Sequence, residues 1–272
     1  MKKPFITALA AALLCGCTST APAEPEKEDL VVFAAASLKE TMTDIKELYE
    51  AEHPEINVVY NFDSSGTLKT QIESGAECDV FISAAPKQMN QLDITADPEI
   101  NTDKLDFVLS ETRFNLLENK VALAVPSGNP EELTGFDDLA ARLQEGNILL
   151  AIGNSDVPVG QYTQKIFKYF NLDEEQLAAR RVLTYGNDVK EVTDQVTEAA
   201  VGAGIIYATD AFSAGLEVID TATPEMCGQV IYPAAVIKTT VREETARDFL
   251  SFLTSEAADG VFTAVGFTPL HE

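Results

Sequence analysis

The sequence predicts an α/β fold of two lobes, each a mostly parallel sheet flanked by helices, with two crossover strands as the hinge. Apolar runs of strand length alternate with segments that carry apolar residues at helical spacing, which is the pattern of parallel sheets covered by helices. The alternation restarts after a longer apolar run at residues 120–126. A chain of 272 residues is also long enough for two domains of ordinary size.

The first lobe begins with a continuous apolar run, and Leu38, Met42 and Ile45 then recur at helical spacing. Two further strands alternate with two further helices. Strand, helix and strand in this order place the strands parallel and the helices on the faces of the sheet. The elements expected here are strands at 30–35, 56–62 and 80–83 and helices at 38–52, 67–74 and 86–92.

The strands at 121–126 and 230–236 are the expected crossovers, which makes the second lobe an insertion in the first. We therefore expect lobe I to comprise residues 29–125 and 232–272, and lobe II to comprise residues 126–231. The other expected elements are helices at 136–142, 161–170, 189–200 and 242–255, strands at 148–152, 181–185, 203–207, 216–219 and 229–238, and a tail at 266–269.

The N-terminus has the features of a lipoprotein export signal. Lys2 and Lys3 form a positive region, and the apolar run of residues 5–14 is too short to span a bilayer as a helix. It leads into Leu-Cys-Gly-Cys, which resembles a lipobox with its small residue directly before Cys17. We expect a signal peptide at 1–16, lipidation at Cys17 and a flexible tether rich in Pro, Ala and Glu at 17–29. An ordinary cleaved signal is the alternative. Either signal predicts export. Lipidation would anchor the protein to the periplasmic or extracellular face of the cell membrane. The lipid would be its only contact with the membrane.

The charge balance excludes two classes of partner. The chain has 44 acidic and 19 basic residues, a formal net charge of −25. Nucleic-acid binding requires a basic surface, and so does the recognition of anionic lipids. Cys78 and Cys227 lie in the exported part, where they either form a disulfide or remain buried thiols. No CxxC or Cys/His cluster predicts a direct cation site.

Four strand-to-helix turns share a small or glycine-containing sequence; they lie at residues 34–37, 63–67, 157–161 and 186–190. A helix N-terminus presents unpaired N–H groups and a partial positive charge, which suit an anion. In the first turn Ser37 also fits a capping box, because Glu40 follows three residues later. Two such turns per lobe, at the strand ends where these folds bind ligands, predict an anion held between the lobes by neutral donors.

Ordered motifs along the chain resemble those of the periplasmic molybdate-binding proteins of molybdate ABC transporters. The resemblance spans about residues 30–270 and implies the two-lobed periplasmic-binding-protein-like fold. The motifs are Val31-Val-Phe-Ala-Ala-Ala-Ser-Leu38, Ser64-Ser65-Gly66-Thr67-Leu68 with Gln71 to Ala76, Asp79 to Ala84, Val157-Pro158-Val159-Gly160-Gln161-Tyr162, Asn187-Asp188-Val189, Gly204 to Asp210, Tyr232 to Val236 and Gly266-Phe-Thr268.

The resemblance implies a ligand, molybdate or tungstate, that is bound as an oxyanion without a cofactor. It also implies delivery to the permease and the ATP-binding subunit of an ABC importer, by a protein that we expect to be a monomer. Five contacts are implied: the hydroxyl and backbone N–H groups of Ser37 and Ser65, the backbone N–H groups of Val159 and Val189, and the phenol of Tyr207.

The residues by themselves leave alternatives open. Ser64 fits the second loop as well as Ser65 does, and Tyr207 also fits a core tyrosine. Gly66 stands where members of this family often carry another serine. Asp63 would repel an anion, so we expect its carboxylate to point away or to cap a helix. Sulfate or another small anion is the alternative ligand. An enzyme is not expected, because the chain has two histidines and neither a Gly-x-Ser-x-Gly nor a P-loop motif.

Overall fold

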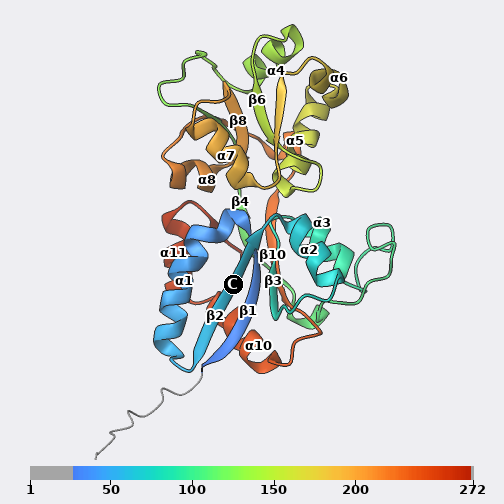
Figure 1. Ribbon diagram of the computed structural model, residues 1–272, viewed down its shortest axis with the longest axis vertical. Coiled ribbons are helices and arrows are strands. Elements are labelled where there is room, and N and C mark those ends of the chain that lie inside the picture. The colour runs from blue at the N-terminus through green and yellow to red at the C-terminus, as the bar shows by residue number, and fades with distance from the viewer. Residues whose placement is uncertain (1–26, 271–272) are drawn as a thin grey trace, which may run out of the picture.

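The computed structural model describes residues 27–270, which form two lobes stacked along the long axis of the molecule (Figure 1). The first lobe contains a six-stranded sheet of order β11-β4-β10-β3-β1-β2, and the second contains a five-stranded sheet of order β7-β6-β8-β5-β9. Helices flank both sheets. The predicted two-lobed α/β fold is confirmed.

The first lobe is built around three parallel strands. Strand β1 pairs in parallel register with both β2 and β3, while β10 and β4 join the sheet antiparallel to their neighbours. The strands are β1 (Glu28–Ala35), β2 (Ile56–Asp63), β3 (Val80–Ile82), β4 (Phe114–Asn119), β10 (Val230–Val236) and β11 (Thr268–Pro269), and the helices are η1 (Ala36–Leu38), α1 (Lys39–Glu52), α2 (Ser65–Glu73), α3 (Pro86–Leu92), η2 (Ser110–Thr112), α10 (Glu243–Phe252) and α11 (Glu256–Ala264).

The second lobe repeats this plan, with β6 parallel to β7 and β8, and β5 antiparallel to β8 and β9. Both sheets are therefore mixed, because β10 in the first sheet and β5 in the second run against the parallel core. The strands are β5 (Val121–Val125), β6 (Leu150–Gly153), β7 (Leu183–Gly186), β8 (Ala203–Tyr207) and β9 (Glu217–Thr221), and the helices are α4 (Phe136–Glu145), α5 (Pro158–Tyr169), α6 (Glu174–Ala179), α7 (Val189–Thr197), α8 (Ala208–Ala214) and α9 (Pro224–Cys227).

The chain crosses between the lobes at two places that lie side by side. Lys120 alone separates β4 of the first sheet from β5 of the second, and the return path enters β10 at Val230. Val230 pairs with Asn119, the last residue of β4. Residues 121–125, which we expected in lobe I, thus pair within the second sheet, and residues 230–231 pair within the first.

The N-terminal expectations fall mostly outside the described residues. The signal peptide, Cys17 and most of the tether lie in residues 1–26. The tether was expected to reach Asp29, but Glu28 and Asp29 already pair with Ile56 and Asn57 in the first sheet. Among the described residues, no helix is long and apolar enough to cross a membrane.

Packing of α7 on its sheet shows how the sequence directs a helix end toward the other lobe. Val189, Val192 and Val196 are buried on one face of α7, at helical spacing. At Gly204, in β8, an added Cβ would lie 2.4 Å from the side chain of Val196, so only glycine permits this close approach. The N-terminus of α7 contacts η1 of the first lobe, and Lys190 in its first turn pairs with Glu40 of α1.

The two cysteines of the described region are free and buried. Cys78 belongs to a cluster on one face of the first sheet and donates to the carbonyl oxygen of Val80 at 3.3 Å. Cys227 ends α9, in the second lobe. The disulfide alternative is therefore wrong, and the alternative of two buried thiols is confirmed.

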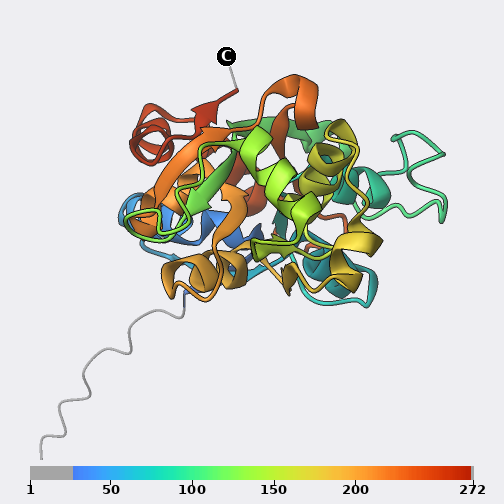
Figure 2. The same cartoon turned by 90° about the horizontal axis from the view of Figure 1, so that it is seen from above.

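Viewed from above, the segment between α3 and β4 projects from the first lobe (Figure 2).

Candidate functional site

One small cavity between the lobes brings together all five residues that the family resemblance selected. Its volume is about 10 Å³, roughly enough for one water molecule. The residues that line it are Ala35, Ala36, Ser37, Ser64, Ser65 and Ala84 of the first lobe and Val157, Pro158, Val159, Val189 and Tyr207 of the second. No charged side chain is among them, so the cavity offers only dipoles and apolar groups.

A larger hollow of about 520 Å³ lies elsewhere, in the second lobe, and is lined by Ile148, Val182 and Val201 among others. These residues precede β6, β7 and β8, so the hollow is at the amino ends of the parallel strands. Ligands of open α/β sheets bind at the carboxyl ends. The small interlobe cavity, which lies at the carboxyl ends of β1 and β8, is therefore the candidate site.

Ser37 lies in the short helix η1 that links β1 to α1, and its side chain is buried. The predicted capping box is wrong: α1 begins after Leu38 without a side-chain cap, and Glu40 pairs with Lys190 of the other lobe. Ser37 Oγ instead lies 2.9 Å from Tyr232 Oη. Its hydroxyl is thus not consumed by the helix end.

The two serines of the second loop, Ser64 and Ser65, make different hydrogen bonds. Ser64 caps α2, because its Oγ accepts the N–H of Thr67 at 3.1 Å. Ser65 Oγ accepts the N–H of Ala84 at 2.9 Å, so its hydroxyl hydrogen is left to donate into the cavity. Asp63 accepts the N–H of Ser64 and does not line the cavity, as expected. These contacts favour Ser65 over Ser64 as a ligand donor.

Two helix N-termini of the second lobe supply backbone donors. Val159 is the second residue of α5, after Pro158, which has no N–H, and Val189 is the first residue of α7. N–H groups in a first helical turn have no acceptor within the helix. Asp188 caps α7 by accepting the N–H of Glu191 at 2.8 Å, so its carboxylate serves the helix end. Gly160 allows α5 to start close to the preceding loop, since a Cβ would lie 2.1 Å from the carbonyl oxygen of Asn154.

Tyr207 supplies a phenol that has no partner among the described residues. Its side chain is 1% exposed, and its Oη is buried without a hydrogen bond. Burial is the main cause that raises the pKa of Tyr207 well above its usual value, and Tyr232 raises it further. The phenol is therefore protonated at neutral pH and is a donor without an acceptor. Burying such a donor costs free energy unless a bound ligand accepts its hydrogen bond.

Sequence reasoning did not select Tyr232 and Asn119, which support the site from behind. Tyr232 is fully buried in β10, and its Oη lies 3.2 Å from Asn119 Nδ2 in β4. If Asn119 donates to Tyr232 and Tyr232 donates to Ser37, the Ser37 hydroxyl hydrogen is free for the cavity. Tyr232 stood in a family motif, but nothing in the sequence pairs it with Ser37, 195 residues away.

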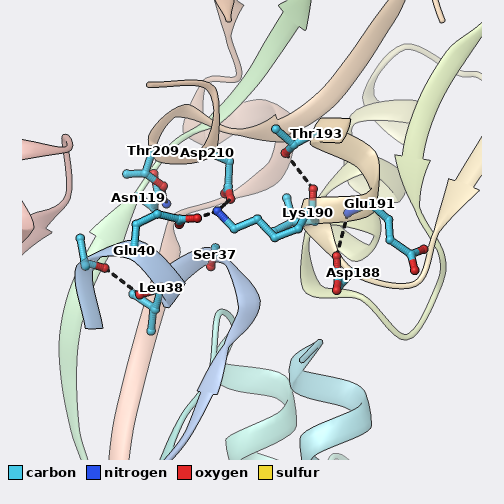
Figure 3. A network of polar contacts seen from close by, with 12 residues as sticks. Ser37, Leu38, Glu40, Asn119, Asp188, Lys190, Glu191, Thr193, Thr209 and Asp210 are labelled. Atoms are coloured by element: carbon cyan, nitrogen blue, oxygen red, sulfur yellow. Dashed lines mark hydrogen bonds and ion pairs between the residues drawn. The ribbon is translucent and has the colours of Figure 1, made fainter. Parts of the chain in front are cut away.

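An ion cluster lies beside the cavity. Lys190 Nζ is 2.6 Å from Glu40 Oε2 and 2.9 Å from Asp210 Oδ1 (Figure 3). Burial, as the largest cause, raises the pKa of Asp210 to about 6, although Lys190 opposes this shift. Within residues 27–270 there is no group of three or more His, Cys, Asp or Glu side chains that could hold a metal ion.

The chain matches one family of known proteins over nearly all of its described length. The model of the family described as bacterial extracellular solute-binding protein covers residues 30–268. A Bacillus subtilis protein, provisionally named as an ABC transporter substrate-binding lipoprotein, is 31% identical over 97% of this chain and 96% of its own length. A molybdate-binding protein of Mycobacterium tuberculosis is 30% identical over 95% of this chain and 93% of its own length. The resemblance found in the sequence is confirmed.

Solved structures share the fold. The periplasmic molybdate-binding protein of Azotobacter vinelandii superposes with a TM-score of 0.74 at 21% identity, covering 89% of this chain and 100% of that one. The sulfate-binding protein of Mycobacterium tuberculosis superposes with a TM-score of 0.70 at 16% identity, covering 89% and 87%. The same architecture thus occurs in proteins named for different oxyanions, so the fold alone does not select the ion.

Proposed function

Because this chain belongs to the family of bacterial extracellular solute-binding proteins, we propose that it captures molybdate or tungstate between its lobes and delivers it to an ABC importer. The observation that carries the proposal is a neutral, closed cavity whose polar groups are donors. Ser37, Ser65 and Tyr207 supply hydroxyl groups, and the first turns that contain Val159 and Val189 supply backbone N–H groups. An anion that can only accept hydrogen bonds completes this set.

The energetics of neutral donors are sufficient for tight capture. The five residues offer seven donor groups, and a hydrogen bond to a charged acceptor contributes about 1.5–3 kcal/mol. Together the seven contribute roughly 10–21 kcal/mol, more than the roughly 8 kcal/mol of a micromolar complex, and the surplus offsets the cost of closing the lobes. No positive side chain is needed, and the formal charge of −25 does not exclude an anion. Salt screens the acidic outer surface beyond about 10 Å.

Sulfate is the second candidate, since it also only accepts hydrogen bonds at neutral pH. The relatives that are named for molybdate and span almost the whole chain favour molybdate or tungstate. Phosphate carries a proton near neutral pH and would require an acceptor, and no carboxylate lines the cavity.

We further propose that the protein is a monomer, anchored through a lipid on Cys17, with a permease and an ATP-binding subunit as partners. Strand β1 runs toward the cavity, so its first residue lies at the end of the first lobe farthest from the second (Figure 1). An anchor joined there would leave the cleft facing away from its own attachment. We assign no catalytic role: His53 stacks on Tyr49 at the end of α1, and neither residue lines the cavity.

Titration calorimetry of the purified protein with molybdate, tungstate, sulfate and phosphate tests the proposal. We expect sub-micromolar binding of molybdate or tungstate, weaker binding of sulfate and no binding of phosphate. Sulfate binding that is tighter than both would overturn the choice of ion. Failure of all four to bind would overturn the assignment of the cavity to oxyanions.

A further inference from the structure

We propose that Lys190 is an interlobe clasp, a positioning residue that holds the lobes closed over the bound anion by pairing with Glu40, while Asp210 keeps it in place. The inference rests on the proposed function, because it concerns closure of the same cavity. Neither Lys190 nor Glu40 lines the cavity, so the clasp acts on closure and makes no contact with the ligand.

The geometry places the clasp at the two segments that carry ligand donors. Lys190 follows Val189 at the start of α7, and Glu40 lies three residues after Ser37, in the first turn of α1. Their side chains meet across the lobes, with 2.6 Å between Lys190 Nζ and Glu40 Oε2 (Figure 3). Any separation of α1 from α7 breaks this pair.

Asp210 has a different part, because it belongs to the same lobe as Lys190. It lies in α8, its side chain is fully buried, and its Oδ1 is 2.9 Å from Lys190 Nζ. This contact persists when the lobes part. A lysine that is already held by Asp210 loses less side-chain freedom when Glu40 arrives, and that entropy is a main cost of ion pairs.

The sign of the effect separates a clasp from simple electrostatics. Glu40 is a negative charge on the segment that binds a dianion, so its removal should tighten binding if only long-range repulsion matters. If Glu40 closes the lobes, its removal should weaken binding through faster release of the anion. The two accounts therefore predict opposite changes for one substitution.

The test compares Glu40→Gln with Glu47→Gln, which makes the same charge change on the exposed face of the same helix. Molybdate affinity is measured by calorimetry, and the release rate by stopped-flow displacement with excess tungstate. Because Glu40 is half exposed, we expect Glu40→Gln to raise both the dissociation constant and the release rate about two- to fivefold, with a smaller difference in high salt. Glu47→Gln should leave both unchanged or bind slightly tighter.

The thermal unfolding midpoint of the unliganded protein should be the same for Glu40→Gln and wild type if the open form dominates without anion. Unchanged or tighter binding by Glu40→Gln overturns the clasp, and so does equal weakening by Glu47→Gln. If the wild type binds none of the oxyanions, the proposed function itself fails, which is a separate result obtained before any substitution.

Discussion

Tyr207→Phe tests the site most directly, because it removes one hydroxyl and leaves the ring in place. Tyr207 Oη is buried, protonated and without a partner among the described residues. A hydrogen bond from this group to an anion is worth about 1.5–3 kcal/mol. Its loss should therefore raise the dissociation constant for molybdate roughly 10- to 150-fold.

Without ligand, the same substitution should leave the unfolding free energy unchanged or raise it. The phenol has no acceptor in the closed form, and replacing an unsatisfied hydroxyl by an apolar group of the same shape removes a desolvation cost. Calorimetry gives the affinity, and thermal melts with and without molybdate give the ligand-dependent shift, which must shrink as affinity falls.

Tyr162→Phe is the matched control. Tyr162 is also a buried tyrosine of the second lobe, with its ring 6.4 Å from that of Tyr207, but its hydroxyl donates to the carbonyl oxygen of Gln229. It does not line the cavity. We expect it to bind molybdate as the wild type does. Binding by Tyr207→Phe within twofold of wild type would refute the inference that its phenol faces the anion.

Three further predictions concern closure, pH and the anchor. At Gly66 an added Cβ would lie 2.4 Å from the carbonyl oxygen of Asp156 in the other lobe, so Gly66→Ala should cost about 1–3 kcal/mol of binding free energy. Small-angle scattering should show that this variant compacts less than wild type when molybdate is added, and full compaction would contradict the prediction. Burial raises the pKa of Asp210 from 3.8 to about 6, so the native state binds more protons than the unfolded state between these values, and the Asp210 contribution to stability falls as pH rises through this window. From pH 4 to pH 7, urea unfolding should show Asp210→Asn gaining about 2 kcal/mol of unfolding free energy relative to wild type, and an equal difference at both pH values would contradict the shift. Cys17→Ser should abolish labelling by a radioactive fatty acid and release the protein from the membrane fraction, whereas retained labelling would place the lipid elsewhere.

The alternation of strands and helices was predictable because each element carries its own period of apolar residues. Strand β4 was missed, since Leu116 and Leu117 are both buried and the strict alternation of a half-exposed strand is absent. The boundary between the lobes was also displaced. A single residue, Lys120, makes the first crossing, and no glycine or proline marks it.

The site was predictable only in part. The hydroxyl groups of Ser37 and Ser65 stand in recognisable turns, but a backbone N–H at Val159 or Val189 leaves no signature in its own side chain. Those two positions came from the family resemblance, and the structure brings them to the same cavity. The contact between Ser37 and Tyr232 joins η1 to β10, which are far apart in the chain, and no local pattern could indicate it.

The adjacency of the two crossings has a mechanical consequence. Strands β4 and β10 form one antiparallel ribbon that is paired up to Val230 and Asn119, at the edge of the second lobe. Hydrogen bonds between the strands resist sliding and twisting of one crossing against the other, whereas bending of the ribbon requires small dihedral changes in a few residues. The lobes therefore move relative to each other mainly by bending of this ribbon, so one hinge angle describes their opening. A membrane partner that contacts both lobes would then distinguish the ligand-bound protein from the unbound one by this angle alone.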